Sequence, residues 1–339
     1  MSEKSFLRPD TGLVSATFFG ASDIVFAELL ELANLVGIQL QRIDAASETV
    51  GILQFDTSGC GQGQVRARFH ELFTPYFAKG SLVLDYRSES TAILELMVAV
   101  GATVRGRVLG VIGAHGGAGA SSFVLGLARE LQRRKFETSV IDLDSISCGL
   151  DLLISGTNFQ GRRWIDLQGR SALLAGRLKN SLPNWKQVRI LSGDDRGGVA
   201  LKGDQGSKAI AALAQVSDWT LLDLPRSALL PNTAANRWMQ WCDSIVIVTR
   251  GDAVSLARSS VLLRQLDRTK AIAVIVMGIQ SQNQLAHIRQ TLSFEQVFGV
   301  RFTRGYLQDL MHGIAPGDRV RGNTSRDIAK FCYQFCEVI

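Results

Sequence analysis

Residues 108–122 read Val-Leu-Gly-Val-Ile-Gly-Ala-His-Gly-Gly-Ala-Gly-Ala-Ser-Ser. The apolar beginning predicts a buried strand over residues 108–112, the glycine-rich centre predicts a loop, and the rest opens a helix predicted over residues 121–134. The backbone N–H groups of such a loop can surround an anion, and the helix N-terminus adds its dipole. Hydroxyls on the first turn, at Ser121 and Ser122, are suited to binding Mg²⁺. The stretch therefore predicts a phosphate site.

Two known glycine motifs compare differently with this loop. The dinucleotide fingerprint G-x-G-x-x-G fails, because Gly113 and Gly116 stand too far apart. The phosphate-loop motif G-x-x-x-x-G-K-[ST] has the right spacing over residues 114–121, but Ala114 replaces its first glycine and Ala120 replaces its lysine. A tight glycine turn that packs strand against helix without a ligand remains the alternative.

Acidic residues end two further predicted strands. The strand predicted over residues 138–143 runs into Asp142-Leu-Asp144, and the strand predicted over residues 220–224 contains Asp223. Ligands of parallel sheets bind at the carboxyl ends of the strands, and carboxylates hold Mg²⁺ directly or through water. A single strand-end aspartate can instead cap a helix, so the prediction of a nucleotide site depends on the loop and these aspartates together.

The rest of the chain alternates strand-like and helix-like segments. Strands that are almost wholly apolar and are separated by helices indicate a parallel sheet covered on both faces. We therefore expect a doubly wound, mostly parallel α/β domain over residues 105–339, preceded by a smaller α/β domain over residues 1–104. The domain over residues 105–339 has further strands predicted at 244–249 and 272–277, with a helix at 255–266. The smaller domain has strands predicted at 16–19, 38–43, 50–55 and 82–84, and helices at 23–36, 64–73 and 92–100.

Composition excludes several classes of protein. The 339 residues are 46% apolar and 20% charged, which is the balance of a globular chain and not of a disordered one. No apolar run approaches the roughly 18 residues of a membrane span, and the first ten residues lack the apolar core of a signal peptide. The five scattered cysteines are typical of reduced thiols in a cytosol. A net charge of +6 permits weak attraction to nucleic acid or anionic lipid but indicates neither.

These motifs together resemble the MinD/ParA superfamily of deviant Walker P-loop ATPases. The segment His115-Gly-Gly-Ala-Gly-Ala-Ser121 is similar to the family's K-G-G-x-G-K-[ST] loop, residues 142–144 to its D-x-D, and Asp223-Leu-Pro to its Walker B segment. More narrowly the chain resembles the CpaE/TadZ-like group and the Ssd-like septum-site-determining proteins. That likeness lies in residues 116–122, 142–144, 149–153, 161–166 and 223–226, and the first hundred residues are similar only in layout to a degenerate receiver-like domain.

The resemblance implies ATP and Mg²⁺ as ligands and assigns roles to particular residues. Asp144 and Arg226 take the catalytic roles, and Arg250 is the weaker alternative to Arg226. Arg226 can instead pair with the carboxylate cluster and neutralise it. The nucleotide-binding residues are Gly116, Gly117, Ala118, Gly119, Ala120, Ser121 and Ser122, and the metal ligands are Ser121, Asp142 and Asp223.

The departures from the family pattern limit the chemistry. Ala120 stands where the P-loop lysine would contact the β- and γ-phosphates, His115 stands where the signature lysine would be, and no asparagine follows Met277 to read adenine. Loss of one charge-assisted contact weakens binding by about 1.5–3 kcal/mol. Phosphoryl transfer depends on such charges even more. We therefore expect weak nucleotide binding and weak or no ATP hydrolysis.

The resemblance implies a nucleotide-dependent positioning protein. Its expected role is localisation of Tad/Flp pilus assembly or regulation of the septum site in cell division, through protein partners of those machineries and as a homodimer. The expected location is the cytoplasm, with recruitment to a pole, the septum or the inner membrane face. An active ATPase that uses an arginine in place of the lysines, and a scaffold that needs no nucleotide, are the alternatives.

Three other stretches have competing interpretations. Residues Arg129 to Lys135 end the predicted P-loop helix and could contact nucleic-acid phosphates, although completing the helix dipole is the more common role. The apolar stripe of the last helix, from about Ser325, predicts core packing and not a membrane anchor. Asp56 occupies the phosphoacceptor position of a receiver domain, but its partner residues are missing, so a pairing or docking surface is expected there.

Overall fold

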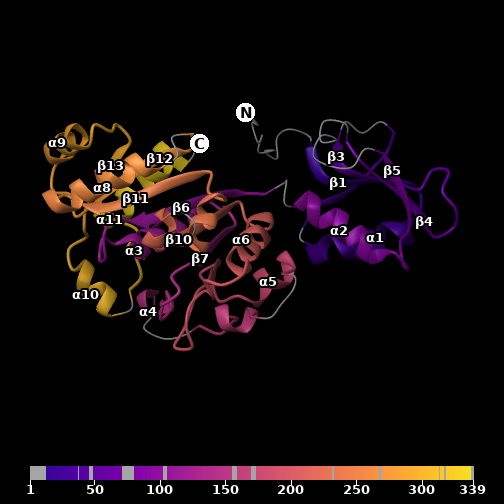
Figure 1. The fold of residues 1–339 in the computed structure, drawn as a ribbon, viewed down its shortest axis with the longest axis horizontal. Helices are drawn as coiled ribbons and strands as arrows, with labels where there is room; N and C mark the ends of the chain where they lie inside the picture. Colours follow the sequence, from indigo (N-terminus) through magenta and orange to yellow (C-terminus); the bar gives the residue numbers. More distant parts are fainter. Residues whose placement is uncertain are drawn as a thin grey trace. The chain divides into compact units, whose positions relative to one another are not determined.

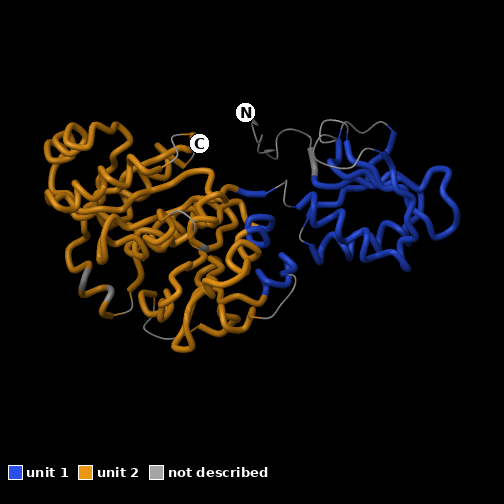
Figure 2. Tube along the Cα trace, in the orientation of Figure 1, with its two compact units in different colours: residues 1–106, 173–180, 211–216 blue, residues 107–172, 181–210, 217–339 orange. Residues whose placement is uncertain are grey.

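The computed structural model describes residues 13–36, 38–45, 49–70, 80–101, 105–154, 159–168, 173–230, 233–266, 269–312, 314–316 and 318–336 (Figure 1). The chain divides into two compact units, which Figure 2 distinguishes by colour. The smaller unit contains residues 1–106, 173–180 and 211–216. The larger unit contains residues 107–172, 181–210 and 217–339.

The smaller unit is built on a five-stranded mixed sheet in the order β2-β1-β3-β4-β5. The strands β1 (Leu13–Phe19), β2 (Leu40–Ile43) and β3 (Val50–Asp56) are parallel, and β4 (Gln64–Phe69) and β5 (Ser81–Asp85) continue the sheet antiparallel. Helices α1 (Asp23–Val36) and α2 (Ser90–Gly101) pack on one face (Figure 1). The core between them contains Phe18, Phe55 and Met97, all fully buried.

The helix predicted over residues 64–73 is wrong, because residues 64–69 form strand β4. Residues 71–73 lie outside the described part of the chain. Val65 and Ala67 are buried, whereas Gln64 and Arg68 are exposed, so the segment has the period of two expected for a strand with one buried face. The backbone of β4 pairs with both β3 and β5, and this pairing fixes the extended conformation.

The larger unit contains an eight-stranded sheet in the order β13-β12-β11-β6-β10-β7-β9-β8. All neighbouring strands are parallel except the short edge strand β8, which is antiparallel to β9. This sheet confirms the predicted α/β fold with a mostly parallel arrangement. Its strands are β6 (Arg107–Gly113), β7 (Thr138–Asp142), β8 (Asn184–Trp185), β9 (Val188–Leu191), β10 (Trp219–Leu224), β11 (Ser244–Arg250), β12 (Ala271–Met277) and β13 (Val297–Val300).

Both faces of the large sheet are buried. Leu109 and Val111 of β6 belong to the core that helix α3 covers, whereas Ile112 points to the opposite face and is also fully buried. This explains why the strands are almost continuously apolar. The helices that lie wholly in this unit are α3 (Ala120–Arg133), α4 (Asp151–Ile154), α7 (Ala234–Met239), α8 (Ala253–Gln265), α9 (Gln282–Leu292), α10 (Tyr306–Met311) and α11 (Asn323–Phe331). Two more helices, α5 (Ala175–Ser181) and α6 (Gln205–Gln215), are divided between the two units.

Helix α11 and the π-helical turn Cys332–Cys336 pack against α3. Ile328, Phe331 and Phe335 are buried, and the Phe331 ring meets Phe123 of α3 edge-on at 5.5 Å between centroids. This placement confirms that the apolar stripe is part of the core. In the part of the chain that the structure describes, no helix has the length and apolar character required to cross a bilayer.

Candidate functional site

The glycine-rich loop lies at the carboxyl end of the central strand β6 and leads directly into α3. Gly119 precedes the helix in the left-handed region at φ 98°, and Gly117 has φ 74°, so both turns use backbone conformations that favour glycine. The loop is anchored by Ala114, whose N–H donates to the Val248 carbonyl at 2.8 Å, and by Ala118, whose N–H donates to the His115 carbonyl at 3.2 Å. These contacts hold the loop open at the edge of the sheet.

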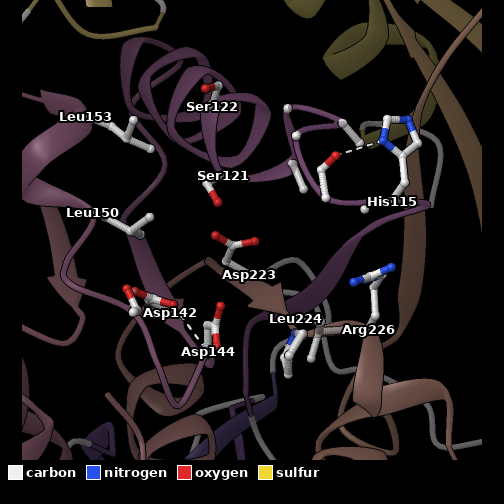
Figure 3. A pocket seen from close by; sticks show the side chains of 18 residues that line it. His115, Ser121, Ser122, Asp142, Asp144, Leu150, Leu153, Asp223, Leu224 and Arg226 are labelled. Atoms are coloured by element: carbon white, nitrogen blue, oxygen red, sulfur yellow. Dashed lines mark hydrogen bonds between the residues drawn. The ribbon is translucent and has the colours of Figure 1, made fainter. Parts of the chain in front are cut away.

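This loop forms one wall of a cavity of about 440 Å³ (Figure 3). The structure brings every predicted site residue to that cavity, including all of residues 116–122 and the three aspartates. Arg226 lines it as well, whereas the alternative cation Arg250 is not among its lining residues. The remaining lining residues are Gly113, His115, Ser147, Leu150, Leu153, Leu224 and Pro225.

Asp223 stands at the centre of the cavity floor, opposite Ser121 (Figure 3). It belongs to β10, which pairs with β6 on one side and β7 on the other, so its carboxylate lies between the loop and Asp142. Burial raises the pKa of Asp223 to about 7, and the charge of Asp142 adds to this effect, while a hydrogen bond from the Ser121 side chain opposes it. A carboxylate in this state would become fully ionised when a cation binds beside it.

Asp142 is more constrained than the sequence suggested. Its Oδ2 accepts hydrogen bonds from the Ser147 hydroxyl and, at 2.6 Å, from the Ser192 hydroxyl, and its Oδ1 accepts the Asp144 N–H at 3.1 Å. Burial raises its pKa despite these donors. The Trp164 indole N–H also donates to its backbone oxygen at 2.7 Å. Asp142 therefore fixes the loop after β7 in addition to facing the cavity.

Asp144 and Arg226 are the exposed charges of the cavity. Asp144 accepts the Ile146 N–H at 3.1 Å, which turns the loop back on itself. Arg226 begins a short 3₁₀ turn after β10. Among the described residues, no carboxylate lies within ion-pair distance of Arg226, so the structure does not show the neutralising pair that was the alternative for this residue.

Ala120 and His115 are the two residues that the sequence resemblance aligned with lysines. Ala120 is the first residue of α3 and packs partly against the core. His115 makes two hydrogen bonds through its ring, one to the Gly116 carbonyl and one to the Ser255 hydroxyl, each 2.9 Å long. Its ring lies on the side of the cavity where Arg226 stands (Figure 3).

Sequence reasoning missed the polar residues that support the site. Arg163 and Asp151 form a bidentate ion pair that is almost fully buried, and the Leu150 N–H donates to the Ser192 hydroxyl at 2.9 Å. Arg196 bridges Asp166 and Asp194 nearby. Asp151, Arg163 and Asp166 fall within the stretches 149–153 and 161–166 that carry the family resemblance, which was the available signal.

The basic residues at the end of α3 have intramolecular partners. Arg129 lies 5.4 Å from the centre of the Trp185 ring and donates to the Lys186 carbonyl at 3.0 Å. Arg134 pairs with Glu130 at 3.0 Å and donates to the Ala329 carbonyl. These contacts support a structural role for the cluster.

Comparison with known proteins adds an independent line of evidence. No protein-family model matches the chain. Two curated proteins of Mycobacterium tuberculosis, each described as an uncharacterized protein, are 33% identical over 162 residues, which is 46% of this chain. The chain spans 43% of the length of these relatives.

Solved structures resemble the larger part of the fold. A ParA family ATPase from Chlorobium tepidum has a TM-score of 0.55 at 16% identity, covering 68% of this chain and 99% of its own. MinD of Aquifex aeolicus in its complex with MinC scores 0.54 at 15% identity, over 68% and 96% of the two chains. MinD of Pyrococcus horikoshii with Mg-ADP scores 0.50 at 13% identity, over 69% and 97%. The parallel sheet with its glycine loop therefore gives this chain the fold of the MinD and ParA ATPases.

Proposed function

We propose that this chain is a nucleotide-dependent positioning protein of the MinD/ParA type, with a degenerate phosphate loop that binds ATP and Mg²⁺ weakly. The observation that carries the proposal is the cavity, in which the loop amides, the first turn of α3 and Asp223 face one another. Backbone donors and the helix dipole do not depend on the missing lysine side chains, so they still attract phosphate groups.

The residues present fit a polyphosphate with its metal ion. The N–H groups of residues 116–122 would hold the phosphates, and Ser121 with Asp223 would hold Mg²⁺, with Asp142 contributing through its remaining lone pairs. Mg²⁺ would neutralise phosphate charge in place of the absent lysines. MinD of Pyrococcus horikoshii was solved with Mg-ADP, which supports this choice of ligands.

Hydrolysis should be weak or absent. Ala120 offers no cation to the transferring phosphate, and charge stabilisation dominates phosphoryl transfer. Arg226 is the exposed cation of the cavity and would approach the γ-phosphate, while Asp144 would orient the attacking water. An active ATPase that relies on Arg226, and a scaffold with a vestigial loop, are the two competing functions.

The biological role follows the family resemblance. We propose that residues 105–339 form the switch domain and that residues 1–104 form a degenerate receiver-like domain that docks to partners. The proposed partners belong to Tad/Flp pilus assembly or to the division septum, to which a homodimer of this cytoplasmic protein would be recruited. MinD of Aquifex aeolicus was solved with MinC, so a protein partner has a precedent on this fold.

Calorimetric titration with ATP and ADP, with and without Mg²⁺, tests the binding. Gly117→Val should abolish it, because a β-branched residue at φ 74° would distort the loop. Gly59→Val is the matched control, since Gly59 has φ 70° and equally open surroundings in the smaller unit. Equal ATP affinity of the wild type and Gly117→Val would refute the proposed site.

Two further measurements separate the competing functions. Steady-state phosphate release should be close to background, and the double change Ala120→Lys with His115→Lys should raise it; robust release by the wild type would favour the active ATPase. Arg226→Ala should weaken ATP binding more than ADP binding, and an equal loss for both would remove Arg226 from the γ-phosphate position.

A further inference from the structure

A pair of stacked aromatic rings lies beside the phosphate loop. The rings of Phe302 and Tyr306, in the segment that joins β13 to α10, are 4.9 Å apart between centroids and 24° from parallel. The hydroxyl of Tyr306 forms a hydrogen bond with the side chain of Ser122, which lines the cavity from the first turn of α3. Tyr306 is therefore tied to the end of the phosphate loop, and the ring stacked on it, Phe302, remains 40% exposed.

The Phe302 ring also lies against the carboxyl end of β12. The side chain of Met277, the last residue of β12, adjoins the loop, because a Cβ added to Gly119 would be 3.5 Å from its Cγ. The next residue, Gly278, adjoins Phe302, and a Cβ there would be 2.8 Å from the ring. The ring pair is thus held next to the loop from two sides, by β12 and by α3.

The two ends of a bound nucleotide would meet different parts of the cavity. Arg226, the cation proposed to approach the γ-phosphate, lies on the same side as His115, whereas Ser122 lies well apart from both (Figure 3). A nucleoside triphosphate with its γ-phosphate toward Arg226 would have its α-phosphate toward Ser122. The ribose and the base would continue from Ser122 toward Tyr306 and Phe302.

The polar groups of the residues that adjoin the Phe302 ring are used within the protein. Gly278 donates its N–H to a carbonyl of β13 at 2.7 Å, and its own carbonyl accepts the side-chain amide of Gln280 at 3.2 Å. The Thr303 N–H donates to the Thr324 hydroxyl at 2.9 Å, and the hydroxyls of these two threonines share a hydrogen bond of 3.1 Å. What this segment offers to a base is consequently the face of an aromatic ring.

We infer that Phe302 is a stacking surface for the nucleobase, and that the site accepts ATP and GTP alike. The inference rests on the proposed function, because the loop must hold the phosphates. Adenine and guanine both present a broad aromatic face and differ in the groups on their edges, so stacking does not distinguish them. The resemblance places an adenine-reading asparagine after Met277, but the Phe302 ring leaves no room for a side chain at Gly278.

Calorimetric titration of the full chain with ATP, GTP and inorganic tripolyphosphate, each with Mg²⁺, tests the inference. Phe302→Ala should lower the affinity for both nucleotides about tenfold, the size of one stacked base. It should leave tripolyphosphate binding unchanged, because that ligand carries no base, and this unchanged binding also shows that the variant has folded. Phe302→Trp keeps an aromatic face and should retain the nucleotide affinity. Tyr333→Ala, which removes a 66% exposed ring from the π-helical turn, is the control and should change none of the three affinities.

The possible results separate this inference from the proposed function. Equal nucleotide affinity of the wild type and Phe302→Ala would overturn the stacking role, as would an equal loss for tripolyphosphate. A preference of more than about tenfold for either purine nucleotide would show that the base edge is read, and would overturn the second part of the inference. Absence of binding for all three ligands would refute the proposed function and the inference together. Tripolyphosphate binding that Gly117→Val abolishes would support the proposed function whatever the result at Phe302.

Discussion

Replacing Asp223 by asparagine should stabilise the larger unit at alkaline pH and leave it nearly unchanged at acid pH. The folded protein raises the pKa of this carboxyl from 3.8 to about 7, chiefly by burial. At about 1.4 kcal/mol for each pH unit, the difference of about 3 units corresponds to about 4 kcal/mol. Asparagine has nearly the same size, keeps a carbonyl acceptor for Ser121 and carries no charge.

The direction follows from proton linkage. Because the folded state holds the Asp223 proton more tightly than the unfolded state, the wild type loses stability as pH rises from about 4 to about 7, and the loss is complete above that. The advantage of Asp223→Asn should therefore be close to zero at about pH 4 and reach about 4 kcal/mol at about pH 8. Relief of the repulsion with Asp142 is already included in this difference.

Urea unfolding followed by tryptophan fluorescence provides the assay. All five tryptophans, at positions 164, 185, 219, 238 and 241, belong to the larger unit, so the signal reports that unit alone. Asp144→Asn is the control, since this exposed side chain of the same cavity should change stability by less than about 0.5 kcal/mol. A stability gain of Asp223→Asn that is the same at both pH values would refute the reasoning.

Three further substitutions test the packing around the site, each by the same unfolding assay. Gly198→Ala should destabilise the larger unit by about 1–3 kcal/mol, because an added Cβ would lie 2.1 Å from the Asp144 backbone oxygen; an unchanged midpoint would disprove that close approach. Arg163→Leu should cost about 3–5 kcal/mol by leaving the buried Asp151 carboxylate unpaired, and the double change with Asp151→Leu should recover most of it. Phe331→Ala should cost about 3–5 kcal/mol, and a loss below about 1 kcal/mol would contradict its burial against Phe123 of α3 and Phe298 of β13.

The large sheet was predictable because its strands are buried on both faces. Continuous apolar runs such as residues 244–249 predict such strands without knowledge of their neighbours. Strand β4 was not predicted, since the alternation of Val65 and Ala67 with polar residues is short and its pairing partners decide the outcome. The edge strands β8 and β13 have two and four residues, too few for a periodic signal.

In the candidate site, too, some residues could be predicted from the local sequence and others depend on partners that only the fold brings near. The glycine loop and the aspartates at residues 142, 144 and 223 have local signatures, and the parallel topology brings them together. The partners of Asp142 do not have such signatures, because Trp164 and Ser192 stand 22 and 50 positions away along the chain. A hydrogen bond between residues that far apart in the sequence depends on the fold, and the residues next to Asp142 in the sequence do not predict it. The same holds for the contact between His115 and Ser255, which are 140 positions apart.

The contact between α11 and α3 determines when during synthesis the packing of helix α3 can be completed. Arg134 at the end of α3 donates to the carbonyl of Ala329, which is added to the chain 195 positions later. At about 5–20 residues per second, this interval lasts about 10–40 s on the ribosome. The apolar side of α3 around Phe123 has no permanent cover during that time. The nascent chain should therefore present a binding surface for chaperones until translation has passed Phe335.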